Sequence, residues 1–100
     1  MAGAATLQRL RALALRLRDD NAVFLADPGD SQPWYDRGYG TGILSALQEL
    51  GYGEGDELQD VLREEADQVA PHRPLTWGQA YQHGFDTGRR ETFEVIGPRA

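Results

Sequence analysis

Two stretches of the sequence carry the same phrase, in which glycines stand beside aromatic residues. WYDRGYGTG spans residues 34–42 and AYQHGFDTG spans residues 80–88, and after the first residue both read Tyr-x-x-Gly-(Tyr or Phe)-x-Thr-Gly. If the phrase is helical, its glycines lie four residues apart on one face of each helix: Gly38, Gly42, Gly84 and Gly88. Glycine inside a helix costs about 1 kcal/mol relative to alanine, so the four together cost about 4 kcal/mol. The fold must therefore include a contact that requires bare backbone.

A stripe of small residues allows another backbone or a ring to pack directly on a helix. Aromatic residues flank the stripe in both copies: Tyr35, Tyr39, Tyr81 and Phe85. We therefore expect the two glycine-bearing helices to cross in close contact at their glycines. The alternative is that the glycines form the floor of a groove for a ligand or a partner helix. In that case the polar side chains near the stripe would contact the ligand, namely Arg37, His83, Asp86 and Arg89.

Turn-forming residues divide the chain into four segments. Clusters of Gly, Pro and Asp occupy residues 27–33 and 51–55, and a Pro-rich cluster occupies residues 71–76. Such clusters mark loops. No segment alternates apolar and polar residues as a half-buried strand does. The sequence therefore predicts an all-α fold, a single domain over residues 1–100, with four helices at about 4–26, 33–50, 56–70 and 76–96.

Local signals support the helix boundaries. Asp30 or Ser31 can cap the second helix, and Pro33 is favourable in its first turn. Gly51 supplies the left-handed conformation that closes this helix. Asp56 and Gln59 have the spacing of a capping box, and Pro71 stops the third helix. The apolar stripe of the first helix is expected to continue as far as Phe24.

The similarity between the two halves extends beyond the phrase. LRDD at residues 17–20 precedes the first copy, as LREE at residues 62–65 precedes the second. One inserted residue in the loop between the helices aligns the rest. We interpret residues 13–51 and 58–97, approximately, as a duplicated helical hairpin whose copies are related by a pseudo-twofold axis.

The groups that could support catalysis or metal binding are few. The chain has no cysteine, which excludes disulfides, zinc thiolates and thiol nucleophiles. His83 and Asp86 stand three residues apart, a spacing that suits a shared metal ion, and His72 is a candidate third ligand. A solvated histidine beside an aspartate explains the pair better. Thr41 and Thr87 recur in the two copies, but no base accompanies them. We expect no catalytic residue, no metal site and no cofactor.

Charge is distributed unevenly along the chain. The predicted first helix is basic before residue 19, with Arg9, Arg11, Arg16 and Arg18. The predicted third helix and its entry are acidic, with Glu54, Asp56, Glu57, Asp60, Glu64, Glu65 and Asp67 against Arg63. Packed side by side, these helices would partly neutralise each other. Facing outward, they would suit self-association or a partner of complementary charge.

The composition indicates the type of genome, the partners and the compartment that suit this protein. All 10 basic residues are arginine, which is typical of a GC-rich bacterial genome. A net charge of −6 argues against general nucleic-acid binding, although the arginines of the first helix leave it as a third hypothesis. No stretch has the roughly 20 apolar residues of a membrane-spanning helix. The arginine-rich start is better explained as part of the first helix than as an organellar presequence, and the absence of cysteine suits a reducing cytoplasm.

The sequence favours two classes of function. The first is a small, acidic, non-enzymatic module for protein interaction or oligomerisation, with a homodimer as the expected assembly. It follows from the duplicated hairpin, the wide apolar surface of the first helix and the lack of a convincing catalytic group. The second is a small-molecule or metal-binding helical protein that uses the aromatic and glycine groove between the second and fourth helices.

Overall fold

The computed structural model describes residues 4–26, 29–52 and 55–96 of the chain. Within these ranges the chain forms four α-helices joined by turns and contains no strand. The helices are α1 (Ala4–Asp20), α2 (Ser31–Glu49), α3 (Gly55–Val69) and α4 (Thr76–Ile96). Two short 3-10 turns, η1 (Phe24–Ala26) and η2 (Ala70–His72), follow α1 and α3. The all-α class with four helices is confirmed.

The prediction that one helix runs over residues 4–26 is wrong. α1 ends at Asp20, and the chain turns before it forms η1. Asn21 explains the break, because its side-chain nitrogen donates to the carbonyl of Leu17 at 2.7 Å and so occupies an acceptor at the end of the helix. The turn redirects the chain and places Phe24, which is buried, against the ring of Trp34 at a centroid distance of 4.8 Å.

α2 begins and ends with the capping residues that its sequence predicts. It starts two residues before Pro33, with Asp30 as the N-cap, whose side chain accepts from the backbone nitrogen of Gln32 at 3.1 Å. At the other end the nitrogen of Gly51 donates to the carbonyl of Gln48 at 3.0 Å. The nitrogen of Tyr52 donates to the carbonyl of Leu47 at 2.8 Å, which completes a Schellman motif. Gly51 has a φ of +94°, as that motif requires.

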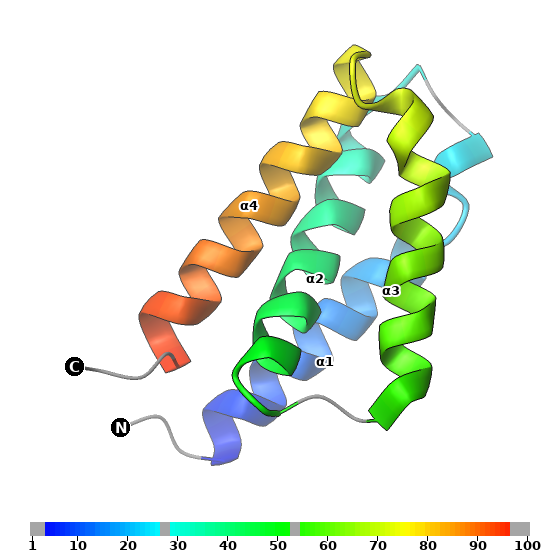
Figure 1. Cartoon of the computed structure of the whole chain (residues 1–100). Coiled ribbons are helices and arrows are strands. Elements are labelled where there is room, and N and C mark those ends of the chain that lie inside the picture. Colours follow the sequence, from blue (N-terminus) through cyan, green and yellow to red (C-terminus); the bar gives the residue numbers. More distant parts are fainter. Residues whose placement is uncertain (1–3, 27–28, 53–54, 97–100) are drawn as a thin grey trace.

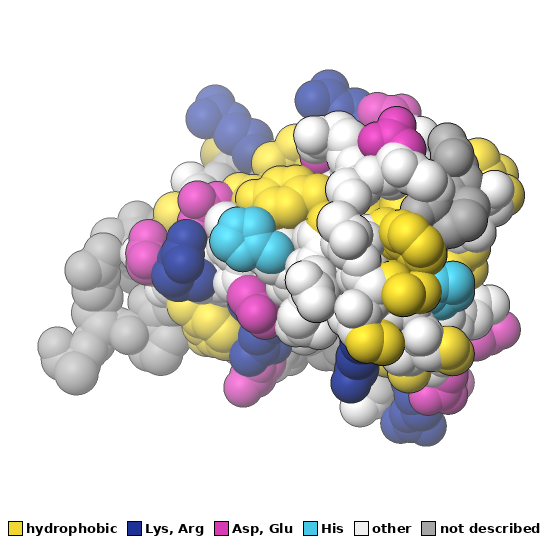
Figure 2. All heavy atoms as spheres, turned by 90° about the horizontal axis from the view of Figure 1, so that it is seen from above, with side chains coloured by type: hydrophobic (Ala, Val, Ile, Leu, Met, Phe, Trp, Pro, Cys, Tyr) yellow, Lys and Arg dark blue, Asp and Glu magenta, His cyan; other side chains and the backbone are white. Residues whose placement is uncertain are grey.

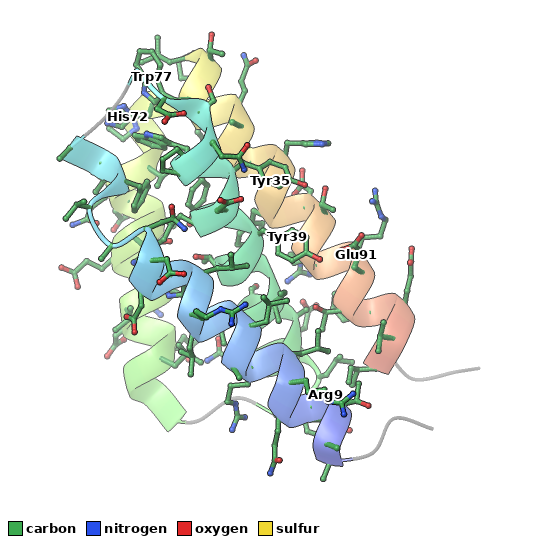
Figure 3. The ribbon with its side chains drawn as sticks, turned by 180° about the vertical axis from the view of Figure 1, so that it is seen from behind. Arg9, Tyr35, Tyr39, His72, Trp77 and Glu91 are labelled. Carbon is green, nitrogen blue, oxygen red and sulfur yellow. The ribbon has the colours of Figure 1, made fainter. Side chains whose placement is uncertain are left out.

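α2 is the central helix of the bundle. α4 packs along it more extensively than any other element, and α1 packs on it from behind in the view of Figure 1. α3 and α4 are joined through η2 and lie on opposite sides of α2 in that view, as they do from behind in Figure 3. The molecule is elongated along the helices, with extents of 40 × 24 × 23 Å.

Two apolar clusters hold the bundle together. The first surrounds Ala14 of α1 and Ile43 and Leu47 of α2, and Leu58 and Leu62 of α3 pack against it. The second lies nearer the η2 end and contains Phe24, Trp34, Val69 and Tyr81. Among the described elements, the backbone of α3 approaches the adjacent η2 most closely and makes few close approaches to the other helices. Its position against the rest of the bundle therefore depends on its side chains.

Candidate functional site

Four glycines of the repeated phrase face backbone atoms of the opposite helix in the α2–α4 pair. A β-carbon on Gly38 would overlap the carbonyl oxygen of Tyr81, and one on Gly84 would overlap that of Tyr35. The second pair of glycines has the same surroundings one turn further along. A β-carbon on Gly42 would overlap the carbonyl of Phe85, and one on Gly88 would overlap that of Tyr39. The space above these four glycines is thus occupied by the backbone of the opposite helix.

The flanking aromatic residues lie on two different sides of the α2–α4 pair. Tyr35 and Tyr39 lie on the side seen in Figure 3, where the Tyr39 hydroxyl donates to the carboxylate of Glu91 on α4. Burial, and after it the hydrogen bond to Glu91, raises the pKa of Tyr39 to about 12. Tyr81 and Phe85, whose rings are 6.5 Å apart, line a cleft that also includes α3.

The four polar residues predicted near the stripe have separate partners. Arg37 pairs with Glu65 of α3, and Arg89 pairs with Glu49 at 2.6 Å. Asp86 accepts from the side chain of Gln82 at 2.9 Å. His83 is exposed and its ring lies 5.6 Å from that of Tyr35.

The two histidines occupy separate positions, which Figure 2 shows on the end of the bundle viewed from above. His72 is engaged elsewhere, since its Nδ1 accepts from the indole nitrogen of Trp77 at 3.1 Å. Among the described residues, no group of three or more His, Asp or Glu side chains could hold a metal ion.

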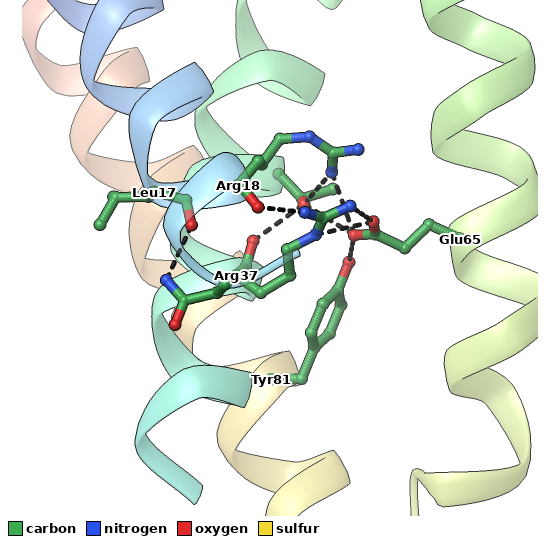
Figure 4. A network of polar contacts seen from close by, with 7 residues as sticks. Leu17, Arg18, Arg37, Glu65 and Tyr81 are labelled. Carbon is green, nitrogen blue, oxygen red and sulfur yellow. Dashed lines mark hydrogen bonds and ion pairs between the residues drawn. The ribbon is translucent and has the colours of Figure 1, made fainter. Parts of the chain in front are cut away.

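A buried carboxylate, Glu65, joins all four helices. It comes from α3, is only 4% exposed, and faces Arg18 of α1, Arg37 and Thr41 of α2, and Tyr81 of α4 (Figure 4). Arg37 donates to Oε1 through Nε at 2.9 Å and through Nη2 at 2.6 Å. Oε2 accepts from Nη1 of Arg18 at 3.1 Å, from the Thr41 hydroxyl at 2.8 Å and from the Tyr81 hydroxyl.

The partners of the carboxylate are themselves connected. Arg18 donates to the Thr41 hydroxyl at 2.6 Å, and Arg37 donates to the backbone carbonyl of Arg18. Among the described residues, no buried side-chain nitrogen or oxygen lacks a hydrogen-bond partner. We call these five residues the Glu65 network. Because every member is satisfied, the network is a rigid element rather than a source of reactive groups.

The electrostatics of the Glu65 network favour an ionised carboxylate. Burial raises the pKa of Glu65, but the hydrogen bonds from Arg37 and Tyr81 and the charge of Arg18 outweigh burial, so its pKa lies below the ordinary value. Burial, followed by the charge of Glu65, raises the pKa of Tyr81, which therefore remains a donor. One carboxylate and two guanidinium groups leave the network with a net positive charge.

Sequence reasoning assigned Arg18 and Glu65 to the charged faces of their helices and missed the ion pair between them. A signal was present in the helical spacing. Leu58, Leu62, Glu65 and Val69 are separated by four, three and four residues, which is the spacing of core positions on a helix. A single carboxylate at such a position indicates a buried partner of opposite charge.

A cleft of about 540 Å³ lies between α2, α3 and α4. Thr41 and Tyr81 of the Glu65 network contribute to its lining, together with apolar side chains that include Leu62 and Phe85. The charged residues among its described lining are Arg63 and Arg73. Its volume is within the range of about 300–1,000 Å³ that is usual for small-molecule sites.

Comparison of the chain with protein families, with curated proteins and with solved structures found no match. None of the described helices is both long enough and apolar enough to cross a membrane. Any function must therefore be argued from the surfaces and sites of this chain itself.

Proposed function

We propose that the chain is a small non-enzymatic oligomerisation module that forms a homodimer, in which α1 of one copy packs against α3 of the other. The observation that carries the proposal is a pair of exposed helix faces with opposite charge. Each face has a half-exposed apolar side chain among its charges, and this combination suits a docking surface better than a fully solvated one.

The basic face belongs to α1 and consists of Arg9, Ala12, Leu15 and Arg16, all of them exposed. Leu15 is 48% exposed. The small Ala12 would allow another helix to approach between the two guanidinium groups. No hydrogen bond or ion pair to a described residue engages the side chain of Arg9 or of Arg16. The face is therefore available for an acidic partner.

The acidic face belongs to α3 and consists of Asp60, Val61, Glu64 and Asp67, which are also exposed. Val61 is 47% exposed, a fraction close to that of Leu15 on the basic face. A second copy of the chain carries both faces, so a twofold pairing would form the same contact twice. Exposed ion pairs contribute only about 0–1 kcal/mol each, so the apolar contacts would supply much of the affinity and the charges would set the partner and the register.

Charge exchange tests this proposal. Wild-type protein is expected to sediment as a concentration-dependent dimer in analytical ultracentrifugation, and to dissociate as salt is raised. The variant Arg9→Glu/Arg16→Glu should be monomeric, and so should Asp60→Arg/Glu64→Arg. An equimolar mixture of the two variants should dimerise again, because each then offers the face that the other requires.

The control is Arg90→Glu, which makes one charge reversal of the same kind at an exposed arginine of α4, outside both faces. It should sediment as the wild type does. A wild-type protein that is monomeric at every accessible concentration would refute the proposal. So would failure of the mixed variants to associate, which would leave a different protein as the partner.

We also propose that the α2–α4 contact is made by the four glycines and that the chain arose by duplication of a helical hairpin. Tyr81 and Gly84 occupy in the second copy of the phrase the positions of Tyr35 and Gly38 in the first. The contact of Gly38 with the Tyr81 carbonyl thus has its counterpart in that of Gly84 with the Tyr35 carbonyl. Such reciprocity is the property of a twofold interface, and it supports an origin in which two identical hairpins paired.

A further inference from the structure

We infer that the cleft between α2, α3 and α4 binds a small organic anion with an apolar body, such as a medium-chain carboxylate. This inference is independent of self-association, because the cleft is lined by other residues than the basic and acidic faces. It places ligand binding beside Tyr81 and Phe85 rather than over the glycines, where the backbone of the opposite helix occupies the space.

The charge around the cleft is the first argument. The protein has a net charge of −6, yet the charged residues in the described lining of the cleft are Arg63 and Arg73. Neither guanidinium group has a hydrogen bond or ion pair to a described residue. The Glu65 network behind Thr41 and Tyr81 adds a further positive charge. A local positive region on an acidic protein favours an anionic ligand.

The second argument is the chemistry of the walls. Leu62, Val69 and Phe85 give the cleft an apolar surface in addition to its two arginines. Ser45 and Gln48 of α2 and Gln82 of α4 add neutral hydrogen-bonding groups. A ligand with a carboxylate at one end and a hydrocarbon chain at the other matches this division, because the arginines hold the acid and the apolar wall covers the chain.

The third argument is that the cleft is preformed. Thr41 and Tyr81 are fixed by their hydrogen bonds to Glu65, and Glu65 also fixes the position of α3, which forms one wall. A ligand would therefore enter without ordering these side chains, and preorganisation of this kind favours affinity.

Isothermal titration calorimetry with three probes of equal chain length tests the inference. Octanoate should bind saturably with one site per chain. Octan-1-ol, which lacks the charge, should bind more weakly, and octylammonium should show no saturable binding. Equal binding of all three probes would mean that the hydrocarbon chain alone determines binding, and would overturn the inference.

Variants locate the site. Arg63→Gln/Arg73→Gln should weaken octanoate binding by about five- to tenfold, as expected for the loss of two partly solvated charge contacts. Ala66→Trp places a large ring in the cleft and should abolish binding while the helical circular dichroism is retained. Arg90→Gln, outside the cleft, should bind as the wild type does. Unchanged octanoate affinity in both cleft variants, or no saturable binding of octanoate to the wild type, would overturn the inference.

Discussion

Replacement of Glu65 by alanine should destabilise the protein more than replacement of any other carboxylate in the described part of α3. The side chain is 4% exposed and lies against two buried or partly buried arginines, Arg18 and Arg37. Alanine would leave both guanidinium groups without their counter-ion, and removing one member of a buried ion pair costs about 3–5 kcal/mol. A domain of this size has a free energy of unfolding of only about 5–15 kcal/mol.

The same loss can be expressed as a change in melting temperature. For a domain of this length, 1 kcal/mol corresponds to about 4–8 °C, so Glu65→Ala should lower Tm by at least about 12 °C. Glu65→Gln retains the volume and some hydrogen bonds but removes the charge. It should lie between the wild type and Glu65→Ala, and the difference between the two variants separates the charge from the packing.

Urea denaturation measures this effect, with tryptophan fluorescence as the probe because Trp34 is fully buried in the second apolar cluster. The matched control is Glu64→Ala, which removes the neighbouring carboxylate from the exposed side of the same helix and is compared at a concentration at which all the proteins are monomeric. Its free energy of unfolding should change by no more than about 0.5 kcal/mol. If Glu65→Ala and Glu64→Ala were equally stable, the Glu65 network would not be the element that fixes α3.

Three further predictions concern the helix contact and the titrating groups. Gly42→Ala should destabilise the protein by about 1–3 kcal/mol in the same denaturation assay, despite the better helix propensity of alanine, because the new β-carbon meets the backbone of Phe85. Gly29→Ala, which has open space around it, should be neutral or slightly stabilising. The pKa of Glu65 is lower in the folded state than in the unfolded state, so the carboxylate stabilises the fold above the unfolded pKa of about 4.3 and this stabilisation is lost as pH falls through the folded pKa. The acid-induced loss of stability should therefore be smaller in Glu65→Gln than in the wild type. Equal acid profiles of the two proteins would contradict this. The pKa of Tyr39 is raised to about 12, so its protonated hydroxyl stabilises the fold below the unfolded pKa of about 10 and this stabilisation is lost as pH rises through 12. Tyr39→Phe should therefore remove the tyrosine that ionises near pH 12 from the absorbance titration at 295 nm.

Both ends of α2 and the end of α3 could be predicted from neighbouring residues. Caps and turns are local, so the roles of Asp30, Gly51 and Pro71 could be recognised from the sequence around them. The capping box predicted at Asp56 is not at the start of α3, because the helix already includes Gly55. The largest error is the end of α1. There the competing interaction is a side chain that bonds its own helix, and the gain from turning is the burial of Phe24 against a residue of α2. The burial of Phe24 depends on tertiary structure, so it cannot be predicted from the local sequence.

For a similar reason, the sequence could not predict which residues pair with Glu65. The sequence contains ten basic and sixteen acidic residues, and helical spacing alone identifies which of them face inward but not which face one another. The partners of Glu65 lie 47 and 28 positions away in Arg18 and Arg37. Their meeting requires that α1, α2 and α3 already be arranged around the same core.

The position of α3 connects the proposals made for this molecule. Its inner side carries the residues that anchor it, its outer side carries the acidic face, and the side between them lines the cleft. Because the backbone of α3 makes few close approaches to the other described helices, the Glu65 network and the apolar side chains Leu58, Leu62 and Val69 determine where both surfaces lie. Glu65→Gln should therefore weaken dimerisation and octanoate binding together. Arg9→Glu/Arg16→Glu and Arg63→Gln/Arg73→Gln should each affect one and leave the other intact. A Glu65→Gln protein that retained both activities at wild-type strength would show that the apolar side chains alone are sufficient to place the helix.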